Sequence, residues 1–251
     1  MSQRGRVIKR TLITLAIMLI ALPVLGLQFG RDWRTADRSS TGIAPDPATT
    51  REAVVQVYAA RAFNWRGLFA VHTWIAIKPR DAANYTIYQV LGWNKYYGRP
   101  LVSVSENSPD RLWYGNPPWL LVDIRGARAE SLIPAIARAV ASYPYPNEYG
   151  LWPGPNSNTF TAFVGRRVPA LGLDLPPTAI GKDYPTNGAI LDSPPSGSGV
   201  QASLWGILGV IISPREGLEV NILSLDFGID IDPIGLRLPL FGNLHLPGND
   251  G

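Results

Sequence analysis

The sequence predicts an α+β domain built on a mainly antiparallel sheet with few helices, carried by one N-terminal transmembrane helix. Three observations lead to this prediction. Short β-branched or alternating runs follow one another with brief connections between residues 54 and 124. A single strong helical pattern covers residues 127–142. A stretch without any charge runs from Thr11 to Gly30, close to the length that a helix needs to cross a bilayer.

The N-terminal charge pattern predicts how the chain is oriented in a membrane. Residues 1–10 carry four basic side chains and no acid, and such a flank stays in the cytoplasm. We therefore expect a cytoplasmic tail (1–10), a transmembrane signal-anchor (11–30), a linker (31–50) and an exported domain (51–251). In a bacterium this describes an inner-membrane protein whose main domain faces the periplasm. A cleaved signal peptide is the alternative, which Pro23 and Gly26 near the outer end would permit.

Composition excludes several classes of function. The chain has 251 residues, 46% of them hydrophobic, which is enough for one domain with its own core. Its net charge of +4 comes from the basic tail, so the body offers no electrostatic surface for nucleic acid. With no cysteine and two histidines, disulfides, thiolate chemistry and a multi-histidine metal site are not expected. No cofactor is indicated.

The first half of the domain is predicted to be strand-rich. The expected strands cover residues 54–60, 71–78, 85–91, 101–105 and 120–124. Leu132, Ile136 and Val140 then repeat every four residues on one helix face. Because proline is tolerated only in the first turn of a helix, Pro134 predicts that this helix begins near Ser131.

The C-terminal half is harder to interpret. Residues 168–199 are rich in Pro, Gly and Ser and are expected to form a lid-like surface loop or a disordered segment. Residues 201–213 are apolar and predict a buried strand or core segment. Residues 218–232 alternate and predict a half-exposed hairpin, with the acidic positions on its exposed side. Asp226, Asp230 and Asp232 could in principle attract calcium or magnesium, but their spacing matches no known loop, and no metal site is expected.

The segment Trp152–Phe160 draws most attention. Prolines and a glycine keep residues 152–155 out of a helix, and the run Asn-Ser-Asn-Thr that follows is suited to cap one. Phe160, Phe163 and Val164 continue at the spacing of a buried helix face. A hydroxyl at such a helix start can serve as a cap, and it can also serve as a nucleophile facing free backbone amides.

Two resemblances bear on this segment. Asn156-Ser157-Asn158-Thr159-Phe160 resembles the Asn-Cys-x-x-Phe signature of circularly permuted papain-like proteins, which include lecithin:retinol acyltransferase relatives and cell-wall peptidase relatives. The chain also resembles a bacterial family known as domain of unknown function 3750, through His-Thr-Trp-Ile at 72–75, Leu-Gly-Trp at 91–93, the Pro-Gly-Pro-Asn-Ser-Asn-Thr-Phe motif and Gly-Leu-Glu-Val-Asn at 217–221. The second resemblance covers most of residues 50–245 and implies no activity.

The papain-like resemblance implies a site made of His72, a polar orienting residue and Ser157, in that order. Gln89 on the next strand is the best match for the orienting residue, with Asn84 and Tyr88 as competitors. Asn156 and Asn158 flank the nucleophile position as candidate binding residues. The chain departs from the signature because serine replaces cysteine. A helix dipole contributes only about 0.3–2 kcal/mol, far too little to ionise a hydroxyl, so Ser157 could react only if His72 removed its proton in the same step.

Two functions from different classes therefore stay open. The first is a Ser-His-Gln hydrolase or acyltransferase that acts on an amide or ester of a cell-envelope peptide or lipid. The second is a catalytically inactive, membrane-tethered binding or scaffold domain of the envelope, for which the many Trp and Tyr side chains would be useful. A hydrogen bond between Ser157 and His72 in an open cleft would favour the enzyme, whereas an aromatic side chain sealing either residue would favour the binding domain.

Overall fold

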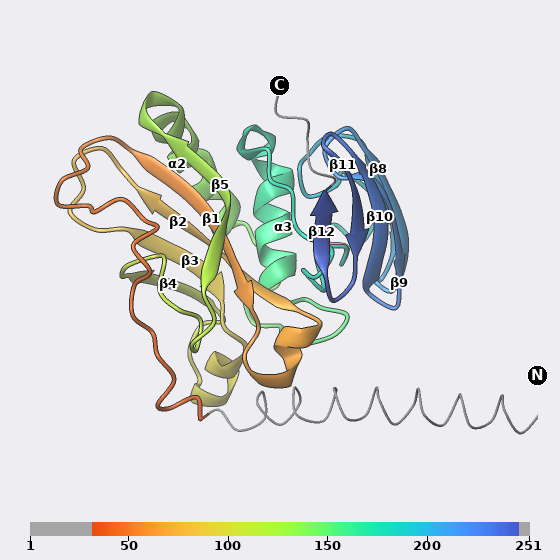
Figure 1. The fold of residues 1–251 in the computed structure, drawn as a ribbon, viewed down its shortest axis with the longest axis horizontal. Helices are drawn as coiled ribbons and strands as arrows, with labels where there is room; N and C mark the ends of the chain where they lie inside the picture. The colour runs from red at the N-terminus through yellow and green to blue at the C-terminus, as the bar shows by residue number, and fades with distance from the viewer. Residues whose placement is uncertain (1–31, 246–251) are drawn as a thin grey trace, which may run out of the picture.

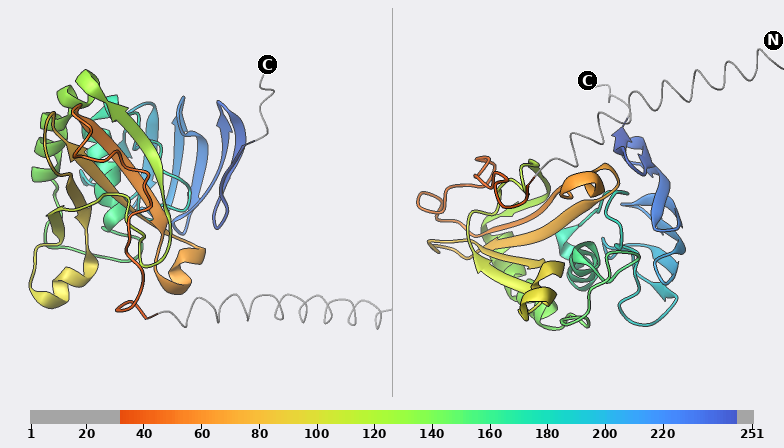
Figure 2. Two further views of the ribbon diagram at one scale, coloured as in Figure 1. Left: turned by 60° about the vertical axis from the view of Figure 1, so that its left-hand side comes forward. Right: turned by 90° about the horizontal axis from the view of Figure 1, so that it is seen from below.

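A computed structural model describes residues 32–245, in which two antiparallel sheets enclose a central helix (Figure 1). The first sheet has the strand order β4-β3-β2-β1-β5, and the second has the order β12-β11-β10-β9-β8-β7-β6. The central helix α3 lies between the sheets, and α2 lies beside it on the same face of the first sheet (Figures 1 and 2). The predicted α+β class with a mainly antiparallel sheet is thus confirmed for these residues.

The elements have the following bounds. The first sheet comprises β1 (Val54–Arg61), β2 (Val71–Lys78), β3 (Thr86–Val90), β4 (Val102–Glu106) and β5 (Pro118–Arg125). The helices are α2 (Gly126–Ala141) and α3 (Ser157–Arg167), with 3₁₀-helices η1 (Asn64–Leu68), η2 (Gly92–Tyr97) and η3 (Pro169–Leu171). The second sheet comprises β6 (Leu191–Asp192), β7 (Val200–Leu204), β8 (Leu208–Ser213), β9 (Gly217–Ile222), β10 (Leu225–Ile231), β11 (Ile234–Leu238) and β12 (Gly242–His245).

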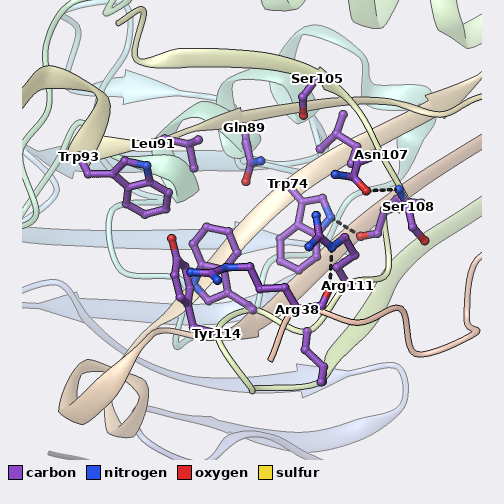
Figure 3. A pocket seen from close by; sticks show the side chains of 14 residues that line it. Arg38, Trp74, Gln89, Leu91, Trp93, Ser105, Asn107, Ser108, Arg111 and Tyr114 are labelled. Atoms are coloured by element: carbon purple, nitrogen blue, oxygen red, sulfur yellow. Dashed lines mark hydrogen bonds between the residues drawn. The ribbon is translucent and has the colours of Figure 1, made fainter. Parts of the chain in front are cut away.

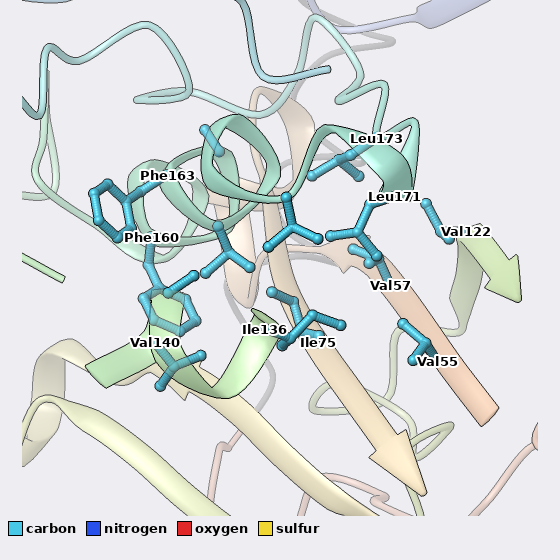
Figure 4. Close-up of a cluster of buried hydrophobic side chains, with 14 of the residues drawn as sticks. Val55, Val57, Ile75, Val122, Ile136, Val140, Phe160, Phe163, Leu171 and Leu173 are labelled. Atoms are coloured by element: carbon cyan, nitrogen blue, oxygen red, sulfur yellow. The ribbon is translucent and has the colours of Figure 1, made fainter. Parts of the chain in front are cut away.

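The main core forms where α2 and α3 pack on the first sheet (Figure 4). Val71, Ile75 and Ile77 of β2 point to this side and pack with Ile136 and Phe160. The residues between them along β2, including Trp74 and Ala76, belong to a second cluster on the opposite side of the sheet. Because side chains alternate along a strand, β2 presents His72, Trp74 and Ala76 to one face and Thr73 and Ile75 to the other.

The segment expected to be a linker is attached to the domain. The Asp110 carboxylate accepts hydrogen bonds from the backbone amides of Ile43 (2.7 Å) and Ala44 (3.2 Å). Tyr85 donates its hydroxyl proton to the Pro45 carbonyl at 2.9 Å. These contacts hold residues 40–45 against the face of the first sheet that the helices leave uncovered.

The second sheet has its polar side chains inside and its apolar side chains outside. Glu219 and Asn221 of β9 are buried, whereas Leu218, Val220 and Ile222 between them are exposed. The predicted hairpin over 218–232 is present as β9 and β10, but Glu219, Asp226 and Asp230 are on its buried side, which corrects our expectation. The reason is a pair of buried cations: Lys182 lies beneath the sheet, Arg237 points inward from β11, and both pair with these carboxylates.

The apolar run 201–213 was also misassigned. It forms the hairpin β7–β8, and its Leu208, Val210 and Ile212 are exposed rather than buried in a core. The inward positions of this hairpin carry Gln201 and Ser203, which bond to Asp183. The apolar run predicted a strand but not a hairpin, and the bonds to Asp183 hold its polar side chains on the inner side.

Two further expectations are corrected. Helix α2 begins at Gly126, not near Ser131, so Pro134 lies inside it. Ala129 and Leu132 pack against the core, and their burial stabilises the turns before the proline. The first part of residues 168–199 is neither a lid nor disordered, because Leu171, Leu173 and Leu175 pack into the main core; residues 187–191 are exposed.

Within residues 32–245, no helix has the length and apolar character needed to cross a membrane. The stretch predicted to be the transmembrane anchor, residues 11–30, lies outside the described residues.

Candidate functional site

His72 and Gln89 lie side by side on the face of the first sheet that is remote from the helices. His72 Nε2 is 3.0 Å from Gln89 Oε1. Because an amide oxygen can only accept a hydrogen bond, His72 donates its Nε2 proton and Nδ1 keeps a lone pair. The other two candidate orienting residues lie elsewhere: Asn84 bonds to Glu106 at 3.0 Å, and Tyr88 packs against the helix-side core.

The imidazole of His72 is enclosed by aromatic rings. Trp113 stacks on it with ring centroids 3.7 Å apart and planes inclined by 10°. The ring centroid of Trp74, on the same face of the sheet, is 5.7 Å from that of His72. Burial lowers the pKa of His72 to about 4, against the smaller opposing effect of the Gln89 hydrogen bond. The ring is therefore neutral at physiological pH.

Trp113 also forms a wall of a cavity of about 190 Å³ (Figure 3). The cavity lies over β2 and β3 and is bordered by η2, the end of β4 and the loop 107–114. Trp74, Trp93 and Tyr114 contribute further aromatic surface, and Trp93 approaches Trp113 with centroids 5.7 Å apart. His72 is covered by Trp113 and does not itself line the cavity.

The charged groups that line the cavity are all positive. Arg38 and Arg111 line it, and no acidic residue does. The Arg38 guanidinium stacks over Tyr114 at 4.3 Å and donates to the Trp33 carbonyl at 2.6 Å. Arg111 uses only its Nε, which donates to the Arg38 carbonyl. Among the described residues, the terminal nitrogens of Arg111, the Trp93 indole N–H and the Gln89 amide N–H groups have no hydrogen-bond partner. Unused donors beside aromatic faces can bind an anion that carries a ring.

Ser157 lies on the other side of the sheet. It is the first residue of α3 and packs against Thr73, whose Oγ1 donates to the Asn158 carboxamide oxygen at 3.0 Å. Since Thr73 and His72 point to opposite faces of β2, the sheet separates Ser157 from the imidazole. Within residues 32–245 no hydrogen bond joins the two side chains. The structure therefore brings His72 together with Gln89 and does not bring Ser157 to them.

Asn156 and Asn158 are engaged by the protein itself. Asn156 is the N-cap of α3, and its Oδ1 accepts from the amides of Asn158 (2.9 Å) and Thr159 (3.2 Å). Its own backbone N–H donates to the Thr159 hydroxyl oxygen at 3.1 Å, which completes a capping box. Asn158 donates to the carbonyls of Val71 (3.0 Å) and Ile180 (2.9 Å). Asn158 attaches the helix start to β2, and both residues attach it to Ile180 in the connection after α3.

Sequence reasoning singled out Gln89 but missed most of the other residues that line the cavity. Trp113 and Arg111 lie in a loop without periodicity, and a loop that folds back on a sheet leaves no local pattern. The only signal was the high number of tryptophans, eight in the chain, and this number does not show which of them lie together in the fold.

The carboxylates considered for a metal have protein partners instead. Lys182 Nζ lies 3.3 Å from Asp226, and Arg237 lies 3.2 Å from Asp230. Asp232 is exposed next to the β10–β11 turn. Among the described residues, no three His, Asp or Glu side chains are grouped so that they could hold a metal ion.

The fold and the site together define a small two-sheet α+β protein with an aromatic, donor-lined cavity. Residues 52–184, which include the whole first sheet, both helices and the cavity loop, match the family described as protein of unknown function (DUF3750). The match covers more than half of the chain, which therefore belongs to that family. The chain matches no curated protein and no solved structure.

Proposed function

We propose that this protein is a membrane-tethered binding domain of the bacterial cell envelope, whose cavity takes a small anion with a ring-shaped body. The basic tail and the uncharged stretch 11–30 support the tether and the periplasmic position of the domain. The single observation that carries the binding function is the cavity beside Trp113, where stacked aromatic side chains meet unused donors.

The arrangement of His72 argues against catalysis. A general base must reach the proton that it removes, and His72 faces away from Ser157 and is covered by Trp113. Its depressed pKa, about 4, makes it a weak base at neutral pH. In a permuted papain-like site the imidazole would face the nucleophile across the helix start. The hydrolase or acyltransferase hypothesis is therefore the second choice.

The size and chemistry of the cavity define the ligand class. Its volume of about 190 Å³ is below the range of roughly 300–1,000 Å³ that drug-sized ligands occupy. It suits one ring, such as a sugar, packed on Trp93 or Trp113. A carboxylate on that ring would accept from the terminal nitrogens of Arg111, which is the most available cation.

Tryptophan fluorescence of the full-length protein in lipid nanodiscs can test this proposal. N-acetylmuramic acid serves as a probe with a sugar ring and a carboxylate, and N-acetylglucosamine serves as the neutral analogue. We expect saturable quenching by the acid and affinity at least about tenfold weaker for the neutral sugar, which corresponds to about 1.4 kcal/mol. Arg111→Gln should abolish the difference between the two sugars, and Trp93→Ala should weaken both.

Arg34→Gln is the matched control, because Arg34 is exposed, does not line the cavity and stacks only on Trp33. It should leave both affinities unchanged. The proposal is wrong if neither sugar gives saturable quenching, and the enzyme hypothesis gains if a fluorophosphonate probe labels Ser157 in the same preparation.

A further inference from the structure

The outer face of the second sheet carries no polar side chain. Its outward positions are occupied only by aliphatic residues and phenylalanine, on every strand from β7 to β12. They are Val200, Ala202, Leu204, Leu208, Val210, Ile212, Leu218, Val220, Ile222, Leu225, Phe227, Ile229, Ile231, Ile234, Leu236, Leu238 and Leu244. We call these residues the apolar face. Ile212, Ile229 and Ile234 are each more than half exposed, so the described chain itself does not cover the apolar face.

The apolar face is the consequence of a stable interior rather than of poor packing. On the inner side of the same strands, Glu219 bonds to Lys182 at 2.5 Å and also pairs with Arg237. Asn221 donates to Asp183 at 2.9 Å and to Asp226 at 2.8 Å. These buried ion pairs fix which face of the sheet points inward, because the opposite orientation would place apolar side chains against the buried charges. The apolar face therefore stays on the outside, where an exposed patch of this kind marks a contact surface.

The turns at one end of the sheet extend the apolar face. In a meander the β7–β8, β9–β10 and β11–β12 turns share one end, and they carry Trp205, Leu223 and Phe241, all strongly exposed. Trp152 joins them, since its indole donates to the Leu223 carbonyl at 3.2 Å. The turns at the opposite end are polar, with Arg215 between β8 and β9 and Asp232 between β10 and β11. The sheet is therefore apolar across its outer face and at one end only.

The described chain begins at that same end of the molecule. In Figure 1 its first residues, in red, lie at the bottom, as do η1 and the turn that leads into β12; Figure 2 shows η1 and η2 close to the viewer when the molecule is seen from this side. Exposed aromatic residues of η1 and η2 add to the end: Trp65, Trp93, Tyr96 and Tyr97. The stretch 11–30, which has no charged residue, precedes it directly. Trp and Tyr gather at the depth of lipid head groups.

From these observations we infer that the apolar face and its aromatic end lie on the surface of the lipid bilayer. A protein partner is a poorer fit, because protein interfaces form about one hydrogen bond per 100–200 Å² and the side chains of this face offer none. A second copy could cover the face by area, but it would not account for the exposed Trp and Tyr side chains at the end where the described chain begins. Lipid needs no hydrogen bonds from this face.

The inference rests on the membrane tether of the proposed function but not on its cavity. In this arrangement residues 11–30 hold the domain at the bilayer, and the apolar face fixes the orientation of the domain on the bilayer surface. The amphipathic sheet then corresponds to an interfacial element whose affinity grows with its buried apolar area.

Lipid contact can be measured in the full-length protein because the chain has no cysteine. Single variants Ile212→Cys and Ile229→Cys place an NBD fluorophore on the apolar face, at residues that are already exposed. Ser131→Cys on α2 is the matched control, because Ser131 is exposed and α2 packs on the first sheet, away from the apolar face (Figure 1). Each protein is reconstituted into vesicles of phosphatidylcholine and phosphatidylglycerol, with or without lipids that carry a nitroxide on the acyl chain.

We expect blue-shifted emission at positions 212 and 229 and quenching by the nitroxide lipids at least about threefold stronger than at position 131. Equal quenching at all three positions overturns the inference. Protection of positions 212 and 229 from aqueous iodide without lipid quenching also overturns it and assigns the face to a second copy if dilution removes the protection. A carbonate wash of the same vesicles tests the tether separately, so a protein that is retained but not quenched disproves only the lipid contact.

Discussion

Lys182→Met provides a demanding test of the buried polar layer that orients the second sheet. Lys182 is 1% exposed and lies 2.5 Å from Glu219 and 3.3 Å from both Asp183 and Asp226. Methionine nearly preserves the side-chain volume but removes the charge that pairs with Asp183, Glu219 and Asp226. Of these three carboxylates, Glu219 keeps its ion pair with Arg237. Breaking a buried ion pair by removing one partner costs about 3–5 kcal/mol. We expect a loss in this range in the free energy of unfolding, measured by urea denaturation of the full-length protein in detergent at pH 7.

The pH dependence of that loss distinguishes charge from packing. Burial raises the pKa of Asp226 and of Glu219, and attraction to Lys182 opposes the rise. Without the lysine both folded-state pKa values rise further above the unfolded ones. The folded state then binds more protons than the unfolded state, and stability falls as the pH increases. The variant should therefore lose less at pH 5 than at pH 7. A loss below about 1 kcal/mol, or one that is independent of pH, would refute the view that paired charges hold this layer together.

Three further outcomes are expected. Asn156→Ala should lower the unfolding free energy by about 0.5–2 kcal/mol because it removes the α3 cap. Phe160→Ala, at a fully buried position, should lower it by about 3–5 kcal/mol. Equal melting temperatures for the parent and Phe160→Ala would contradict the packing of α3. The pKa of His72, about 4, lies below its unfolded value of about 6.5. The NMR signals of the His72 ring should therefore stay unchanged from pH 8 to pH 6. The stability that the neutral ring contributes should be lost as the pH falls from about 6.5 to about 4. A titration midpoint near 6.5 would show that the ring is not enclosed. Gln89→Leu removes the hydrogen bond that raises this pKa and should lower it further, which the same titration measures.

Much of the first sheet could be predicted from sequence. The strands over 54–60 and 71–78 follow from β-branched runs and appear as β1 and β2 with nearly the same bounds. The capped helix after Pro155 was predicted for the same reason, because N-caps depend on residues next to one another. Both predictions use local chemistry, which a sequence displays directly.

The orientation of the second sheet could not be predicted in the same way. Alternation at 218–222 fixes which residues share a face but not which face is buried. That choice depends on Lys182 and Arg237, which come from other parts of the chain and make the inner side polar. A similar limit applies to the candidate site. Alternation along β2 puts His72 and Thr73 on opposite sides of the sheet, but β2 is buried on both faces, so its sequence does not show which side faces Ser157.

The separation of His72 from Ser157 is the central claim, and the alkylation rate of Ser157→Cys tests it most directly. The introduced thiol is the only one in the chain, so its reaction with iodoacetamide reports on that position alone. An imidazole in contact would stabilise the thiolate and accelerate the reaction, and its removal would slow it. We predict the same rate and the same pH dependence in Ser157→Cys and in the double variant that also carries His72→Gln. A rate that exceeds that of a free thiol and falls about tenfold or more without His72 would show that the two residues act together.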